Sequence, residues 1–246
     1  MQFTKMEGLG NDFVVVDGSV EITPDLVRGL ADRRRGVGAD GVLQVTVDEG
    51  IVRMRYWNAD GSAAEMCGNG LRCVARYAVD RGLVKGSTFT IKTPVGERRV
   101  IVADEPRVEL GPAEMGGSFE FEGWVLHRVG VGNPHTVAFV QDLSTAPVAE
   151  LGSELERLTP GGINVEFVRT VDRHKIEMRV WERGIGETMA CGSGMVAAAA
   201  ASHQLGFTDT EVIVRVPGGE GIVELDGATS WLVGPVSYSF TGETSE

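Results

Sequence analysis

The sequence predicts a mixed α/β fold made of two pseudo-symmetric copies of one domain. Short apolar or alternating runs, typical of strands, are interspersed along the whole chain with segments typical of helices. The run Met54–Asn58 (MRYWN) recurs as Met178–Glu182 (MRVWE), an offset of 124 residues (178 − 54). The tetrapeptide CGNG at Cys67–Gly70 recurs at the same offset as CGSG at Cys191–Gly194. Matched islands at one spacing indicate an internal duplication.

A third matched pair, Gly10-Asn11 and Gly132-Asn133, lies close to the same register. Because the repeat covers half of the chain, it is far longer than the unit of about 20 to 50 residues in a solenoid, and it indicates two domains. The stretch Gly111–Gly117 is rich in residues that break regular structure. We therefore expect domains at residues 1–115 and 116–246, with the option that the last residues pack back on the first domain.

In the first half, the β-branched run Phe13–Val16 predicts a strand. A helix is expected over Pro24–Arg34, because Thr23 can cap it, proline suits the first helical position, and a glycine follows its end. The alternating run Ile51–Trp57 predicts a second strand. A second helix, Leu71–Gly82, is expected after the CGNG motif.

The second half follows the same order. A strand is expected at Thr136–Val140, a helix at Val148–Leu158 and a strand at Ile176–Trp181. After the CGSG motif, a helix is expected over Met195–His203, which contains five consecutive alanines, and a strand at Val212–Val216 follows. Each half therefore contains strand, polar loop, cysteine and helix in this order.

The composition is that of an ordinary globular protein. The chain has 246 residues, 42% hydrophobic and 24% charged, so it can bury a core without disulfides. A net charge of −12 argues against nucleic acid or an anionic membrane as a partner. No apolar run reaches the roughly 20 residues needed to cross a bilayer, and the N-terminal segment lacks a signal-peptide pattern. We expect a cytoplasmic protein that acts on a small molecule.

The three cysteines are too few for a disulfide framework, and we expect them to be thiols. The four histidines show none of the spacings typical of zinc ligands, so we expect no metal site. Cys73 lies inside a predicted helix, and its equivalent in the second half is Ala197. Because buried free cysteine is common in protein cores, we interpret Cys73 as a packing residue.

Cys67 and Cys191 stand at the start of predicted helices. Unsatisfied backbone N–H groups and the positive end of the helix dipole lie there, and both favour thiolate. The neighbouring glycines let backbone amides approach an anion such as a substrate carboxylate. For one such cysteine, a small buried residue at a helix entry is an equally good interpretation. Two such cysteines at equivalent positions of the repeat favour a functional role for both.

Two equivalent thiols suit the inversion of a carbon centre by two bases. One thiolate removes a proton from one face, and the other thiol delivers a proton to the opposite face. The α-carbon of an amino acid is a weak acid, so the developing carbanion needs electrostatic stabilisation, which helix N-termini can supply. This chemistry predicts an amino-acid racemase or epimerase that uses no cofactor.

Longer motifs around these residues closely resemble the diaminopimelate epimerase family, in the family's order and over nearly the whole chain. They are Gly8–Phe13, Asn58–Gly70, Gly132–His135, Glu182–Thr188 and Ala190–Gly194. The resemblance implies interconversion of LL- and meso-diaminopimelate without pyridoxal phosphate or another cofactor, in the bacterial route to lysine and peptidoglycan. It also implies two α/β domains, each a barrel-like sheet around a central helix, with the active site in the cleft between them, and a homodimer.

By this resemblance, Cys191 takes the proton of the LL substrate and Cys67 donates a proton on the other face. His135 and Glu182 match polar groups that assist these transfers, and Arg183 matches an arginine that binds the distal carboxylate. Asparagine suits such a substrate because its amide both donates and accepts, and arginine offers carboxylate a bidentate fork. The matched substrate-binding residues are Asn11, Asn58, Gly68, Asn69, Asn133, Asn164, Glu182, Arg183, Gly192 and Ser193.

Departures and alternatives remain. Glu7 stands where the family usually has histidine, and asparagines beside glycine are commonly plain turn residues. A proline or hydroxyproline racemase shares the two-cysteine logic, but it typically carries histidine at the place of Asn69. A binding or redox-sensing protein could instead form a Cys67–Cys191 disulfide. The GxGxxG pattern at Gly36–Gly41 follows a predicted helix rather than a strand, which argues against a dinucleotide site.

Overall fold

The computed structural model describes residues 1–244 and divides into two compact units. The first unit comprises Met1–Val108 together with the segment that begins at Gly234, and the second comprises Glu109–Val233. The chain leaves the first unit within β8 (Pro106–Gly111) and returns to it after β17 (Ser230–Val233). The domains expected at 1–115 and 116–246 stay a prediction.

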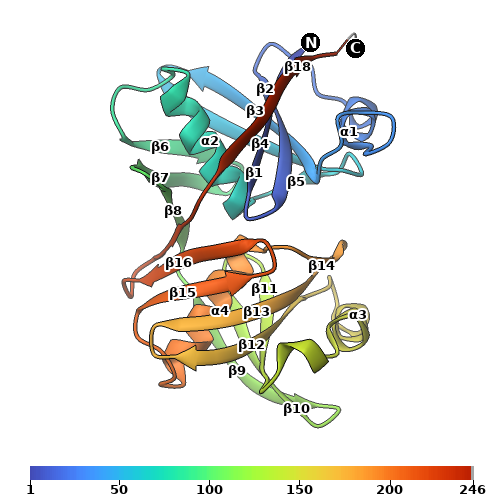
Figure 1. The fold of residues 1–246 in the computed structure, drawn as a ribbon, viewed down its shortest axis with the longest axis vertical. Coiled ribbons are helices and arrows are strands. Elements are labelled where there is room, and N and C mark those ends of the chain that lie inside the picture. The colour runs from blue at the N-terminus through green and yellow to red at the C-terminus, as the bar shows by residue number, and fades with distance from the viewer. Residues whose placement is uncertain (245–246) are drawn as a thin grey trace. The chain divides into compact units, whose positions relative to one another are not determined.

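The first unit is a sheet packed against one central helix, α2 (Gly68–Asp80), which contacts β1, β2, β3, β4 and β7 (Figure 1). Its strands pair in the order β18, β1, β2, β3, β4, β6, β7, β8, with β5 beside β4. The pairs β2–β3 and β4–β6 are parallel and the others are antiparallel. The strands are β1 (Gln2–Gly8), β2 (Asn11–Asp17), β3 (Gly41–Asp48), β4 (Ile51–Asn58), β5 (Ala63–Ala64), β6 (Thr88–Thr93), β7 (Gly96–Val102) and β18 (Ser237–Glu243).

The second unit repeats this plan around α4 (Gly192–Gln204), which contacts β10, β11, β12, β13, β15, β16 and β17 (Figure 1). Its strands pair in the order β9, β10, β11, β12, β13, β15, β16, β17, with β14 beside β13. Here β11–β12 and β13–β15 are the parallel pairs. The strands are β9 (Glu114–Phe121), β10 (Trp124–Gly130), β11 (Pro134–Phe139), β12 (Asn164–Asp172), β13 (Lys175–Glu182), β14 (Gly186–Thr188), β15 (Glu211–Val216) and β16 (Gly219–Leu225).

The register of the parallel pairs confirms the predicted duplication. Phe13 of β2 pairs with Gly41 of β3, and His135 of β11 pairs with Asn164 of β12. Each pair is connected through a helix, α1 (Pro24–Ala31) in the first unit and α3 (Val148–Leu158) in the second. The two units are therefore copies of one mixed α/β domain.

A hydrophobic core lies between each connecting helix and its sheet. In the first unit, Val27 and Leu30 of α1 pack with Val14 and Val42. In the second unit, Leu151 and Leu155 of α3 pack with Val165 and Phe167, among other residues. Burying such a side chain stabilises the fold by about 1.5 to 3 kcal/mol, so these clusters fix the helices on the strands.

The structure confirms α3 at its predicted bounds and corrects the end of α1. That helix was expected to reach Arg34 but ends at Ala31. Asp32 has an extended backbone, and its carboxylate accepts the N–H groups of Arg34 and Arg35. A side chain that satisfies backbone N–H groups competes with the next helical turn, so the helix stops there.

The helices after the two cysteines begin earlier than predicted. The sequence places their starts at Leu71 and Met195, whereas α2 begins at Gly68 and α4 at Gly192. The intervening glycines carry little helix signal, because glycine is a poor helix former. Each cysteine is consequently the N-cap residue of its helix, which brings the sulfur atom to the open end of the backbone.

All five predicted strands lie within β2, β4, β11, β13 and β15, except that β11 ends at Phe139. The GxGxxG segment runs from after α1 into β3, in agreement with its predicted context. Several strands were not predicted. In β9, for example, Glu114–Ser118 are all exposed, so the alternation that marks a half-buried strand is missing. Among residues 1–244, no helix is long and apolar enough to cross a membrane.

Candidate active site

The first thiol caps α2. The backbone of Cys67 is extended, with φ −145° and ψ 115°, and its sulfur accepts the N–H of Gly70 at 3.4 Å. The thiol also lies 3.5 Å from Oδ1 of Asn11, to which it can donate. Cys67 is partly exposed. The sulfur therefore sits at a helix N-terminus within reach of solvent or a ligand.

Two asparagines and a buried arginine form the surroundings of Cys67. Nδ2 of Asn69 donates to Oδ1 of Asn11 at 3.3 Å, and Nη1 of Arg72 donates to Oδ1 of Asn69 at 3.0 Å. Asn11 is held from the other side, because its Nδ2 donates to Asp40 at 2.7 Å. Arg72 is fully buried. These hydrogen bonds fix both amides and leave an amide oxygen facing the sulfur.

Asn58 and Glu7 lie at the ends of strands, beside turns of the first unit. Asn58 ends β4, and its Nδ2 donates to Oγ of Ser62 at 3.0 Å. Glu7, near the end of β1, accepts the N–H of Gly10 at 2.9 Å. Glu7 thus stabilises the turn that precedes Asn11. Gly68 and Asn69 lie in the first helical turn after Cys67.

Cys191 holds the N-cap position of α4, and its thiol is buried. Its sulfur lies 3.6 Å from Oγ of Ser193, one of the two residues, with Gly192, that begin the helix. A side chain at Gly194 would place its Cβ 3.3 Å from this sulfur and 2.7 Å from Oε1 of Glu166. The start of α4 therefore packs closely against both groups.

His135 connects three residues of this site. Its Nε2 lies 2.9 Å from Oδ1 of Asn133 and 3.0 Å from Oγ of Ser193. Its Nδ1 lies 2.6 Å from Oε1 of Glu166. The imidazole is 1% exposed and Glu166 is 0% exposed. A hydrogen-bonded chain thus runs from Glu166 through His135 and Ser193 to the sulfur of Cys191.

Glu182 reaches the same thiol from β13. Its Oε1 accepts the hydroxyl of Thr188, and it hydrogen-bonds Cys191. Burial raises the pKa of its carboxyl group. Asn164 and Arg183 lie nearby in the chain, and Oδ1 of Asn164 accepts the N–H of Arg183 at 3.0 Å. The side chain of Arg183 is exposed, and its Nη1 donates to the carbonyl of Gly161 at 3.2 Å.

The two thiols have different charged neighbours. Burial, followed by the nearby Glu182 and Glu166, raises the pKa of Cys191 well above that of a free thiol. Arg72, a buried cation, lies in the first turns of the helix that begins after Cys67. Nearby carboxylates disfavour thiolate. The thiol form of Cys191 is therefore favoured.

Cys73 is fully buried inside α2, and burial raises the pKa of its thiol. The thiol form therefore persists at neutral pH, consistent with a packing residue. Within residues 1–244, no cluster of three or more His, Cys, Asp or Glu side chains is placed to hold a metal ion.

Two site residues were not predicted from the sequence, namely Glu166 and Arg72. Both are charged residues in otherwise apolar runs, between Val165 and Phe167 and between Leu71 and Cys73. Lysine, arginine, aspartate and glutamate are almost never fully buried without a partner. A charged residue within an apolar run of a strand or helix was thus the sequence signal that could have identified these two residues.

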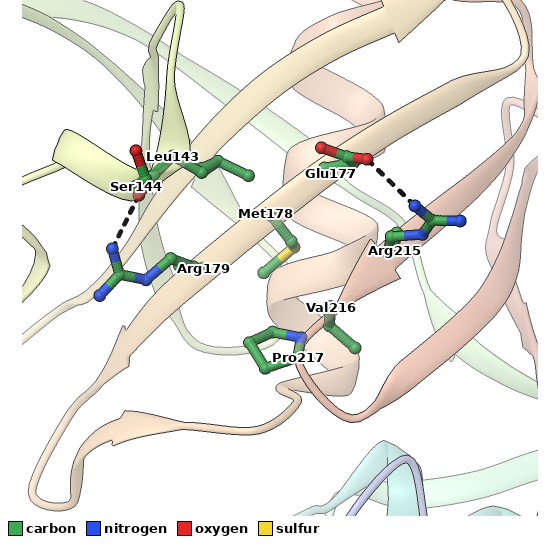
Figure 2. Close-up of a pocket in the computed structure, with 8 residues that line it drawn as sticks. All are labelled: Leu143, Ser144, Glu177, Met178, Arg179, Arg215, Val216 and Pro217. Atoms are coloured by element: carbon green, nitrogen blue, oxygen red, sulfur yellow. Dashed lines mark hydrogen bonds and ion pairs between the residues drawn. The ribbon is translucent and has the colours of Figure 1, made fainter.

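A pocket of the second unit lies away from these groups. It is formed by β13, β15 and the segment at Leu143, and Figure 2 shows the eight side chains that line it. Its charged groups are engaged locally, since Arg179 donates to the carbonyl of Leu143 and Arg215 pairs with Glu177. None of the predicted site residues lines it.

Comparison with known proteins identifies the relatives of this chain. The family model described as diaminopimelate epimerase matches residues 3–116 and 128–239. A diaminopimelate epimerase of Halorhodospira halophila is 42% identical, over 99% of this chain and 94% of that protein. One of Corynebacterium glutamicum is 41% identical, over 98% of this chain and 97% of that protein.

Solved structures share the fold at low sequence identity. A phenazine biosynthesis protein of the PhzF family from Enterococcus faecalis has a TM-score of 0.78 at 14% identity, over 100% of this chain and 99% of that chain. A probable proline racemase from Agrobacterium radiobacter has a TM-score of 0.77 at 16% identity, over 99% of this chain and 92% of that chain. At these identities the likeness extends to the fold alone.

Proposed function

The chain belongs to the diaminopimelate epimerase family, and from that membership we propose that Cys67 and Cys191 are the two bases of its reaction. The enzyme is an isomerase that interconverts LL- and meso-diaminopimelate. The observation that carries the proposal is that both cysteines hold the N-cap positions of equivalent helices in a duplicated fold. The proposal requires both sulfur atoms to reach the same α-carbon.

In the proposed mechanism, a thiolate forms an S–H bond with the α-proton while the C–H bond breaks. The electron pair stays on the α-carbon and its carboxylate, and the opposite thiol protonates that carbon on the other face. The sulfur that began as thiolate ends as thiol, so the enzyme is left ready for the reverse reaction. The step balances without an oxidant, a reductant or a cofactor.

The helix starts support the electrostatic part of this mechanism. The N–H groups at the helix starts Gly68-Asn69 and Gly192-Ser193 can bind the α-carboxylate as negative charge develops on it. Removing one such donor from an enzyme costs about 3 to 4 kcal/mol of transition-state stabilisation. Arg183 is proposed to bind the distal carboxylate. The proposed donors and acceptors for the remaining substrate groups are Asn11, Asn58, Asn133, Asn164 and Glu182.

The family resemblance assigns Cys191 as the base for the LL substrate. Burial and the nearby carboxyl groups favour the thiol form of Cys191, so this thiol must lose its proton before it can act as a base. We propose the direction that the resemblance gives, with Cys191 as the base for LL-diaminopimelate and Cys67 as the donor. His135 and Glu182 assist these proton transfers.

The test follows the α-proton of LL-diaminopimelate in D₂O with reduced protein. The wild type is expected to form meso-diaminopimelate labelled at the inverted carbon. Cys67→Ala and Cys191→Ala are each expected to lose at least about 100-fold of the inversion rate. Proline serves as the control substrate and is expected to remain unchanged. Reduced, folded protein that neither exchanges nor inverts diaminopimelate would overturn the function proposed for the two cysteines.

The single variants also decide the direction. If Cys191 removes the proton from LL-diaminopimelate, Cys67→Ala still exchanges its α-hydrogen for deuterium without inversion, and Cys191→Ala does not. The reverse pattern would overturn this assignment. We also propose that the protein is a cytoplasmic homodimer that supplies lysine and peptidoglycan synthesis. Light scattering tests the homodimer by measuring the molecular mass in solution. A gene knockout that requires added diaminopimelate for growth would support the proposed pathway.

A further inference from the structure

Glu166 is a buried carboxyl group that none of the cysteine motifs includes. It lies in β12 between the core residues Val165 and Phe167, and no part of its side chain is exposed. Its Oε1 is 2.6 Å from Nδ1 of His135. Burying an ionisable group is costly unless it is paired, so its presence in an apolar strand requires an explanation.

The first unit shows that the fold does not need this pair. By the register of β2–β3 and β11–β12, Phe13 and Leu43 of the first unit occupy the places of His135 and Glu166 in the second. Both Phe13 and Leu43 are fully buried. The same architecture therefore forms with apolar residues at both positions. The polar pair of His135 and Glu166 is specific to the second unit.

The contacts of the imidazole place its protons. Nε2 lies 2.9 Å from Oδ1 of Asn133, an oxygen that can only accept, so Nε2 carries a hydrogen. The short contact between Nδ1 and Oε1 of Glu166 holds a second proton. Whichever of the two atoms carries it, the His135–Glu166 pair is neutral overall, which suits a site without solvent.

This arrangement gives the hydrogen-bonded chain a direction. Nε2 of His135 also lies 3.0 Å from Oγ of Ser193, which accepts from it. The hydroxyl hydrogen of Ser193 is then available to the sulfur of Cys191 at 3.6 Å. Gly194 permits the packing, because a Cβ there would lie 2.7 Å from Oε1 of Glu166.

We infer that Glu166 is a positioning residue that holds the proton of His135 on Nε2 and thereby turns the Ser193 hydroxyl toward the sulfur of Cys191. The inference rests on the proposed function of Cys191. Without Glu166, neutral imidazole is free to carry its proton on Nδ1, and the Ser193 hydroxyl then donates to Nε2 rather than to sulfur. Proton transfer at Cys191 loses the hydrogen bond that stabilises its thiolate.

The experiment combines kinetics with NMR of ¹⁵N-histidine-labelled protein, in which a His135→Asn sample assigns the signals of His135. Glu166→Leu removes the partner of Nδ1 and installs the residue that the first unit has at this place. Glu166→Gln keeps the shape and can donate its amide N–H to Nδ1, so it preserves the proton on Nε2. Glu177→Gln is the control, because it removes a partly buried carboxylate of the same unit that is paired with Arg169 and Arg215 and contacts none of the proposed site residues.

In the wild type, we expect His135 with a proton on Nε2 and a strongly hydrogen-bonded Nδ1. Glu166→Leu is expected to lower kcat by about tenfold or more, with KM within about twofold, and to move the histidine proton toward Nδ1. Glu166→Gln is expected to recover most of kcat and the wild-type histidine pattern. The control is expected to match the wild type in both readouts.

Three results overturn the inference. The first is an NMR spectrum of the wild type in which Nε2 of His135 carries no proton. This result needs no variant, so it tests the inference even if Glu166→Leu does not fold. An unchanged kcat in Glu166→Leu overturns the inference as well. A lower kcat with an unchanged histidine pattern reduces Glu166 to a structural role. A wild-type protein that never exchanges the α-hydrogen of diaminopimelate contradicts the proposed function instead. The NMR measurement of the His135 proton does not depend on that result.

Discussion

Arg72 illustrates how one buried side chain can set the reactivity of another. It is fully buried in α2 and holds Asn69, whose amide contacts Asn11 beside Cys67. A cation in a poorly solvated place favours a nearby thiolate. Its charge is opposite to that of the carboxylates near Cys191, although the two cysteines are equivalent in the fold.

We expect Arg72→Met to slow the alkylation of Cys67 by iodoacetamide at pH 7 by about tenfold, because the thiolate loses its buried cation. Mass spectrometry of the labelled peptide measures the rate. Arg76→Met is the matched control, since Arg76 lies one turn later and donates to the backbone carbonyls of residues 103 and 104. Equal rates in both variants and the wild type would contradict this role of Arg72.

Asp12 predicts a dependence of stability on pH. Burial alone raises its pKa, but hydrogen bonds from Arg33 and Lys5 outweigh burial and lower the pKa from 3.8 to about 2. A carboxyl group with a depressed pKa stabilises the fold at pH values above 3.8 and loses that contribution as pH falls toward 2. The shift corresponds to about 2 kcal/mol.

Urea unfolding between pH 5 and pH 2 measures this contribution. The wild type is expected to lose about 2 kcal/mol more than Asp12→Asn over that interval, since asparagine does not titrate. Parallel losses in the two proteins would show that the ion pairs of Asp12 with Arg33 and Lys5 do not carry the effect.

At the scale of elements, the two equivalent helix starts differ in how closely they are packed. A Cβ at Gly194 of α4 would lie 2.7 Å from Oε1 of Glu166 and 3.3 Å from the sulfur of Cys191. A Cβ at Gly70 of α2 would lie 3.0 Å from a methyl group of Leu43. A leucine methyl group can shift more readily than a carboxyl group hydrogen-bonded to a buried imidazole.

We therefore expect Gly194→Ala to destabilise the protein by about 1 to 3 kcal/mol and to lower epimerase activity more than Gly70→Ala does. Gly70→Ala is the matched variant, because it adds the same methyl group at the equivalent position. Thermal unfolding and the initial rate with LL-diaminopimelate measure the two effects. A Gly70→Ala protein that suffers as much as Gly194→Ala would refute the difference in packing.

The elements also show where sequence reasoning succeeds. The helix of α4 was predictable from its five alanines, and α3 from the apolar spacing of Leu151 and Leu155. The starts of α2 and α4 were not, because glycine rarely opens a helix and the preference of the cysteines for the N-cap is a property of the packed structure. Strand β9 lacks a buried face over its first half and leaves no periodic signal.

The candidate site likewise contains features that could be predicted from the sequence and features that could not. Residues beside the cysteines, such as Asn69 and Ser193, could be predicted because the motif itself carries them. The pairing of Glu166 with His135 could not, because the two residues are 31 apart in the sequence and only the parallel register of β11 and β12 brings them together. Interactions that depend on strand register are not written in local sequence patterns.

At the scale of the whole molecule, strand β18 completes the sheet of the first unit. It pairs with β1 from Gln2, opposite Glu243, to Glu7, opposite Ser237. We expect truncation of the chain before Ser237 to lower the unfolding temperature of the first unit by at least about 5 °C. The reason is that β1 loses the hydrogen bonds along one edge.

Calorimetry measures this loss. Tyr238→Phe is the control, since it removes only the 2.9 Å hydrogen bond from the tyrosine hydroxyl to Asp80 and keeps the strand. A truncated chain that melts with the same profile as the full chain would show that β18 adds nothing to the stability of the first unit.

The return of β18 also affects how the protein is made. The ribosome synthesises β1 before every other strand and its neighbour β18 after them. The second unit, Glu109–Val233, is one uninterrupted stretch and can fold while the rest is still being translated. During that interval β1 presents an unpaired edge, the kind of surface on which nascent chains aggregate and to which chaperones bind. Vectorial synthesis therefore favours an order in which the inserted unit closes first and the enclosing unit last.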